Sequence, residues 1–197
     1  MTSSSKMIVG RILEAILKLT SERDEVDSRK IAEHSLTSES MVNRILEEFD
    51  LGSRIGFEQR VRIALEAIRI GVDGERISRY LDWREFESLA AEAFREIGYE
   101  VYGGLRFKYG GRWHQVDLLA YNGIFMLLVD CKHWRKPPSP SEEERMVVEQ
   151  EERLMDLKDA LSLLWRGSGE LKEITLIPAI LTIYEPRKKL LRGHMFM

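Results

Sequence analysis

Asp117, Asp130 and Lys132 are the residues of this sequence whose types and spacing best suit catalysis. The two aspartates lie in apolar segments, Val-Asp-Leu-Leu and Leu-Val-Asp-Cys, where a carboxylate is unfavourable unless its charge is compensated. A hard divalent cation compensates it, and Mg²⁺ commonly binds one or two protein carboxylates together with phosphate oxygens. Lys132 would add positive charge where a phosphate under attack becomes more negative. These residue types indicate metal-assisted hydrolysis of a phosphodiester.

A β-hairpin is the element that must position these side chains. Two strand-like segments, 114–121 and 124–132, flank Asn122-Gly123, which is a strong signal for a two-residue turn. A turn of that length predicts that Tyr121 pairs with Ile124.

In that register Asp117 faces Leu128, and it shares one side of the hairpin with Asp130 and Lys132. Asp130 then lies diagonally from Asp117, with the Cα atoms roughly 7 to 8 Å apart, and Cys131 points into the core on the opposite side. Taken singly, the residues leave an alternative open. Asp130 and Lys132 could be a solvent-facing pair on an edge strand, with Asp117 a surface acid near a turn.

The elements around the hairpin predict an α/β sandwich with a mixed sheet. A helix over 84–97 is expected after an N-cap at Asp82, and Gly103-Gly104 is expected to separate two short strands. Ser141 and Glu144 have the spacing of a capping box. The remaining expected elements are strands 99–102 and 105–109, a helix over 142–165 closed by Gly167-Ser-Gly169, and a strand over 174–184. Residues 194–197 resemble the start of a further strand, so the chain is expected to continue.

The first 80 or so residues predict helices only, at 8–19, 29–34, 39–49, 57–70 and 75–81. Their order fits a helix-turn-helix unit, but the candidate recognition helix, 39–50, has four acids and one arginine, which disfavours contact with phosphates. We therefore expect a separate N-terminal all-helical domain over 1–81, helix-turn-helix-like in order, and a second domain over 82–197.

Composition describes a globular protein of 197 residues, 44% hydrophobic and 32% charged, without the roughly 18 consecutive apolar residues of a membrane span. With a single cysteine and no signal core, the expected compartment is the cytoplasm. Net charge is −3, yet the segment 102–136 holds six cations against two acids. Such a basic island suits a polyanionic substrate. Its candidates for nucleic-acid contact are Arg112, His114, His133, Arg135 and Lys136.

Two segments resemble a known family. Asp117 followed after twelve residues by Asp130-Cys131-Lys132 resembles the bipartite motif of the PD-(D/E)xK nuclease superfamily, which has the restriction-endonuclease-like fold. The segment 86–101, with its Phe-Glu start and Gly-Tyr-x-Val end, looks like the helix that opens an Mrr-type catalytic domain. The resemblance covers about residues 82–184. It departs at Asp130, where glutamate is commoner, and at 112–115, which replaces a glycine-rich approach to the first acid.

The resemblance implies a role for each matching residue. Asp117 and Asp130 match the metal-binding acids, Lys132 the catalytic lysine, and Glu87 an acid that reaches the metal through water. Gln150 is similar to a glutamine near the site in several branches. The function implied is a Mg²⁺-dependent endonuclease, with Mn²⁺ as a substitute, acting on DNA, with RNA left open and a homodimer expected. The rival interpretations are a catalytically silent nuclease-like subunit that binds nucleic acid or serves assembly, and a helix-turn-helix regulator.

Overall fold

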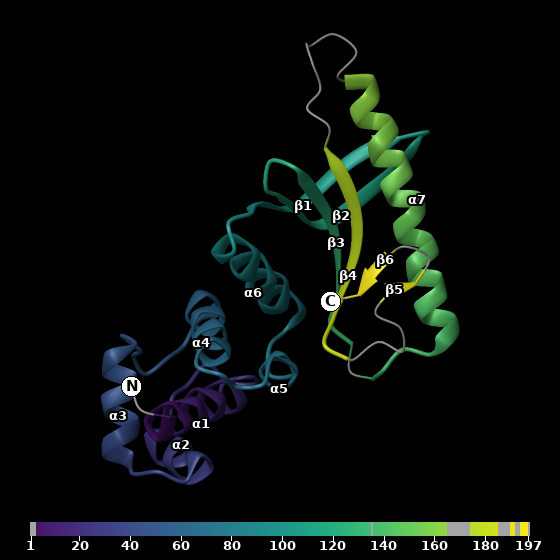
Figure 1. Cartoon of the computed structure of the whole chain (residues 1–197). Helices are drawn as coiled ribbons and strands as arrows, with labels where there is room; N and C mark the ends of the chain where they lie inside the picture. Colours follow the sequence, from purple (N-terminus) through teal and green to yellow (C-terminus); the bar gives the residue numbers. More distant parts are fainter. Residues whose placement is uncertain (1–2, 135, 165–173, 185–189, 192–193, 197) are drawn as a thin grey trace. The chain divides into compact units, whose positions relative to one another are not determined.

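The computed structural model describes residues 3–134, 136–164, 174–184, 190–191 and 194–196, and the chain divides into two compact units (Figure 1). The first unit is Met1–Leu89 and the second is Ala90–Met197. The boundary falls inside helix α6 (Trp83–Glu96), which contributes Leu89 to the helical core and Ala90 to the core beneath the sheet. No described helix is long and apolar enough to cross a membrane.

The first unit is a helical bundle, as the sequence predicted. Its caps follow the expected chemistry: the side chain of Asp27 accepts a hydrogen bond from Lys30 N, and that of Ser38 accepts one from Met41 N. Ile12, which is fully buried, belongs to its apolar core. The helices are α1 (Ser3–Leu19), α2 (Ser28–Ser35), α3 (Glu39–Glu48), α4 (Phe57–Arg69) and α5 (Gly74–Ser78).

One feature of this unit differs from the prediction of helices only. The segments before α2 and after α3 form an antiparallel bridge, Glu25 to Arg54, in which Val26 N donates to Ser53 O at 2.9 Å. This pairing closes the loop around α2 and α3. Between these two helices, Leu36 adopts a left-handed conformation with φ of 52°, so the predicted helix, turn, helix order is confirmed.

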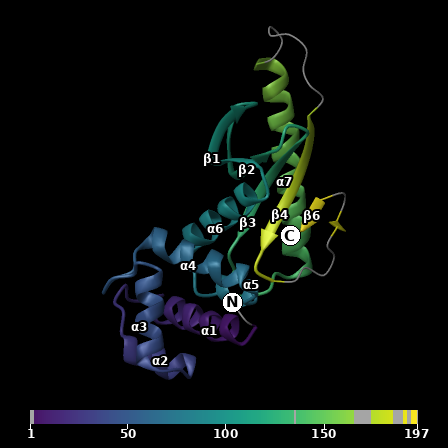
Figure 2. The ribbon, with the colours of Figure 1, turned by 60° about the vertical axis from the view of Figure 1, so that its left-hand side comes forward.

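The second unit is a mixed sheet with helices on both faces, which confirms the predicted fold class. Its strand order is β1-β2-β3-β4-β6-β5, in which β3, β4 and β6 run parallel and the other neighbours antiparallel. Residues of α6 pack on one face and those of α7 on the other (Figure 2). The elements are β1 (Glu100–Tyr109), β2 (Arg112–Tyr121), β3 (Phe125–Lys132), α7 (Pro140–Leu164), β4 (Thr175–Thr182), β5 (Leu190–Leu191) and β6 (His194–Phe196).

The expected break at Gly103-Gly104 is wrong as a strand boundary, because β1 continues through it. What changes there is the side on which the residues pack. Val101 lies in the cluster under α6, whereas Leu105 and Phe107 lie in the cluster under α7, although all three have the same parity. Gly104, with φ of 64°, permits this reversal because it has no Cβ.

The two-residue turn at Asn122-Gly123 is also wrong. Tyr121 pairs with Met126 rather than with Ile124, so four residues separate the paired positions. The Asn122 side chain explains the longer loop, since its Oδ1 accepts hydrogen bonds from Ile124 N at 3.2 Å and Phe125 N at 2.8 Å. The shift of two positions preserves the alternation of faces.

The start of α7 corrects the predicted capping box. Ser139 and Glu142, not Ser141 and Glu144, form it: Ser139 N donates to Glu142 Oε2 at 2.7 Å, and Glu142 N donates to Ser139 Oγ at 3.3 Å. Pro140 fills the first helical position, which suits a residue without an N–H. The predicted end at Trp165 and the following Gly167-Ser-Gly169 lie outside the described residues. The predicted strand over 174–184 is confirmed by β4, and the strand start expected at 194–197 is confirmed by β6 over His194–Phe196.

Candidate active site

The candidate site forms where β2 and β3 separate. Their pairing ends at Leu118 with Val129, while β3 goes on pairing with β4 to the level of Lys132. Asp117 lies at this fork, and its Oδ2 accepts a hydrogen bond of 2.8 Å from the backbone N–H of Cys131. The Asp117 carboxylate thereby accepts a hydrogen bond from a backbone N–H of β3 at a level where β2 no longer pairs with that strand.

Asp130 is held by two cations on the face of the sheet that α7 covers. The residue is only 6% exposed, and its Oδ2 lies 2.8 Å from Lys132 Nζ. Its other oxygen, Oδ1, lies 3.3 Å from a guanidinium nitrogen of Arg153, which α7 supplies. Cys131 packs with the cluster under α6, on the opposite face as predicted, although it is half-buried rather than fully buried.

Gln150 connects this pair of charges to the sheet. It is 1% exposed, and its Nε2 donates to Leu128 O at 2.8 Å and to Ala179 O at 3.2 Å. Its Oε1 accepts a hydrogen bond from Arg153. The backbone of β3 and β4 therefore fixes Gln150, Gln150 fixes Arg153, and Arg153 contacts Asp130.

The environment of Asp117 opposes its negative charge. Burial raises the pKa of this carboxyl above its ordinary value, and the neighbouring charge of Asp130 raises it further. The hydrogen bond from Cys131 N and the positive charges of Lys132 and Arg153 lower the pKa without cancelling the rise. Two mutually repelling carboxylates at a fork in a sheet are an arrangement that a bound cation would relieve.

These residues fit a divalent cation. Among the described residues no group of three or more His, Cys, Asp or Glu is placed to hold a metal, but Mg²⁺ needs only one or two protein carboxylates. Oδ1 of Asp117 has no hydrogen-bond partner among the described atoms. Oδ2 of Asp130 becomes available to a cation once the ammonium of Lys132 moves away from it. Glu87, predicted as a further ligand, is half-buried on α6 and belongs to the first unit.

The predicted nucleic-acid contacts are dispersed. His114 stacks on Phe107 with ring centroids 4.9 Å apart, and its Nε2 lies 3.0 Å from Asp156 Oδ2, without the alignment of a hydrogen bond. Most of the His114 ring is therefore covered by protein. Arg112 and Lys136 are exposed, and His133 is half-buried. The fifth candidate, Arg135, lies outside the described residues.

Arg153 is the residue of this cluster that sequence reasoning missed. It lies 23 positions after Asp130 in a helix rich in charged residues, so no local spacing connects the two. The available signal was its position three residues after Gln150, since positions i and i+3 of a helix are neighbours. A buried glutamine and an arginine on one helix face indicate a polar contact beneath that face.

Comparison with known proteins agrees with the geometry. The family model Mrr_cat, described as a restriction endonuclease, matches residues 78–160, which confirms the predicted resemblance. No curated protein matches the chain. A solved structure, titled "Crystal Structure of Protein of Unknown Function AF1548", shares 16% identity with a TM-score of 0.36. That match covers 49% of this chain and 44% of the other, so it spans less than half of that protein and adds nothing to the assignment.

Proposed function

We propose that this protein is a Mg²⁺-dependent endonuclease that hydrolyses phosphodiester bonds in DNA. The observation that carries the proposal is the meeting of Asp117, Asp130 and Lys132 at the fork between β2 and β3. A nuclease-type family match over the same segment supports it. The intact set of two acids and a lysine favours an active enzyme over a catalytically silent subunit.

Asp117 and Asp130 are the proposed metal ligands, through Oδ1 of the first and Oδ2 of the second. Glu87 stays a proposed third ligand through water. A divalent cation at these oxygens would supply Lewis-acid activation of the attacking water and of the phosphate. Mn²⁺ should substitute, because it too accepts carboxylate and water oxygens.

Lys132 and Arg153 each contact a different carboxylate oxygen of Asp130. Lys132 must leave Asp130 Oδ2 to act on substrate, and its ammonium then stabilises the negative charge that develops on the phosphate and helps to orient the attacking water. Arg153 keeps its contact with Oδ1, so the carboxylate stays oriented while Lys132 moves. Gln150 positions Arg153 and does not touch the reacting atoms.

Cleavage of supercoiled plasmid in Mg²⁺, Mn²⁺ or chelator tests the proposal. Asp117→Asn should weaken Mg²⁺ binding measured by calorimetry, because an amide supplies an oxygen without charge. Lys132→Met keeps the apolar stem, so folding and metal binding should persist while single-turnover cleavage falls by roughly 10² or more.

Lys158→Met is the matched control, since Lys158 is exposed on α7 and pairs with no carboxylate among the described residues. Its cleavage rate should equal that of the wild type. Full activity in Lys132→Met would refute the role of the lysine. Absence of cleavage with every divalent ion, on both DNA and RNA, would refute the proposed function.

A further inference from the structure

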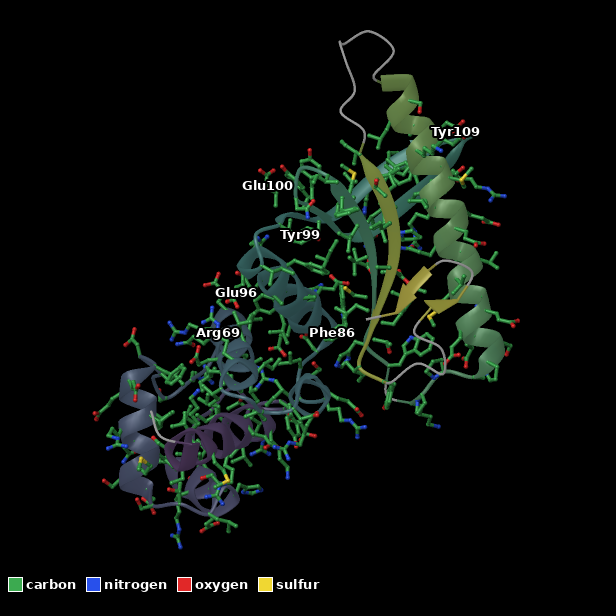
Figure 3. All side chains as sticks on the ribbon, viewed as in Figure 1. Arg69, Phe86, Glu96, Tyr99, Glu100 and Tyr109 are labelled. Atoms are coloured by element: carbon green, nitrogen blue, oxygen red, sulfur yellow. The ribbon has the colours of Figure 1, made fainter. Side chains whose placement is uncertain are left out.

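The distal half of the β1–β2 hairpin has one covered face and one open face. Beyond the reversal at Gly104, Phe107 and Val116 pack in the cluster under α7 with Leu157. Tyr109, at the end of β1, lies beside α7 (Figure 3) and donates a hydrogen bond to Asp159 on that helix. The residues that alternate with these point away from α7, and they are exposed.

The open face carries aromatic and cationic side chains. Trp113 is 71% exposed, and Lys108, its direct cross-strand partner, has its ammonium 6.0 Å from the ring centroid. Arg106 pairs across the strands with Gln115 on the same face. We call Arg106, Lys108, Trp113 and Gln115 the hairpin face.

No carboxylate offsets these cations along the hairpin. The segment 105–116 contains no Asp or Glu, and Arg106 and Lys108 have no ion-pair partner among the described residues. An exposed aromatic ring beside cations that have no acidic partner is a combination found on surfaces that bind nucleic acid. Its charge is complementary to a polyanion that also presents flat apolar rings.

Nucleic acid with unpaired bases meets both requirements. Cations contact the phosphates, and an exposed indole stacks on a base whose face is free, which the stacked bases of a duplex do not offer. Trp113 and Asp117 lie on the same strand, four residues and about 13 Å apart at the usual rise per residue. The hairpin face and the candidate site are therefore neighbours along β2.

We infer that the hairpin face binds a single-stranded segment of the substrate, with Trp113 stacking on a base and Arg106 and Lys108 contacting phosphates. The inference rests on the proposed function only in treating the bound strand as a substrate, because binding a strand does not require catalysis. The inference narrows the substrate class to single-stranded nucleic acid, or to branched or frayed DNA with unpaired bases beside the cut.

Fluorescence anisotropy with labelled oligonucleotides tests this inference in chelator, using Asp117→Asn protein so that no strand is cut. The ligands are a single strand, a blunt duplex and a fork of equal length. We expect the single strand and the fork to bind more tightly than the duplex. Trp113→Leu should weaken single-strand binding about fivefold or more, the lower end of the contribution of one stacked base.

Two variants separate stacking from simple loss of an exposed residue. Trp113→Phe retains a ring and should restore most of the affinity. Trp83→Leu is the matched control, because Trp83 is also exposed, at 54%, and has the guanidinium of Arg84 5.2 Å from its ring. It should bind like the parent protein.

Unchanged single-strand binding in Trp113→Leu would overturn the inference, as would preference for the blunt duplex. Such results would leave the hairpin face as a surface for a protein partner. Cleavage by the wild type with unchanged binding in Trp113→Leu would reject the inference alone. Tryptophan-dependent binding without any cleavage would reject the proposed function and leave the inference standing.

Discussion

At the residue scale, the ionised carboxylate of Asp117 destabilises the fold when no metal is bound. Its folded-state pKa is raised by burial and by Asp130, so the native state holds its proton more tightly than the unfolded state does. Protonated Asp117 therefore stabilises the folded protein at acidic pH. This stabilisation is lost as the pH rises above the pKa that Asp117 has in the unfolded chain and through its higher pKa in the folded protein.

Replacing Asp117 by Asn should therefore raise the melting temperature of the metal-free protein at neutral pH. The amide oxygen can still accept the Cys131 N–H, so the hydrogen bond is retained while the charge is removed. Thermal denaturation in chelator, from acidic to neutral pH, measures the effect. The gain should shrink toward acidic pH, and a gain that instead grows on acidification would contradict the assigned pKa direction.

Arg153 should be worth more to stability than an exposed arginine of the same helix. Arg153→Met removes the cation from Asp130 Oδ1 and from Gln150 Oε1, and loss of such a partly buried charged partner costs about 2 kcal/mol. Arg145→Met, which breaks an exposed pair with Glu149, should change stability by less than about 0.5 kcal/mol. Urea denaturation compares the two variants, and equal effects would remove the structural role of Arg153.

At the scale of elements, local sequence patterns predicted the helices and their caps, because short-range interactions determine these features. Periodicity and caps located the helices, and Asp82 with Glu85 closes a reciprocal cap at the start of α6. Ser139/Glu142 and Ser141/Glu144 have identical spacing, so spacing alone could not choose between them; Pro140, which favours the first helical position, does.

The candidate site was predictable because its three residues share one hairpin. The parity that places Asp117 and Asp130 at the fork survives the shift of two positions in the register. Two features were not predictable. The Asn122 side chain lengthened the loop by taking two backbone N–H groups, and Arg153 arrives from a helix whose docking depends on the whole sheet.

Gly104 should be the residue that β1 needs for its reversal of faces. Gly104→Ala places a Cβ at φ of 64°, a conformation that costs a side chain about 1 to 2 kcal/mol. Gly103→Ala is the matched control, because Gly103 lacks a positive φ and a Cβ there would meet its nearest atom, Asp117 O, at 3.8 Å. Chemical denaturation should show a loss for Gly104→Ala only, and equal losses would contradict this explanation.

At the scale of the whole molecule, the division into domains stays a prediction. All strands of the described sheet lie after Tyr99, as a separate N-terminal domain requires. The expected boundary at Leu81, however, precedes a helix that contributes to both cores. Homodimerisation also stays a prediction, and light scattering that gives a monomer at assay concentration would remove it.

The charge of the whole chain makes a last prediction about nucleic-acid binding. Net charge is −3, so a bound strand is attracted by the local cations of the hairpin face and not by the protein as a whole. Each phosphate neutralised on a single strand contributes about 0.7 to the slope of log affinity against log salt concentration. Two cations, Arg106 and Lys108, therefore predict a slope of about −1.4 in a salt titration followed by anisotropy. Arg106→Gln should reduce its magnitude by about 0.7, whereas Trp113→Leu should lower affinity at every salt concentration and leave the slope unchanged. A slope steeper than about −5 would mean that many other cations hold the strand, and it would contradict binding centred on this face.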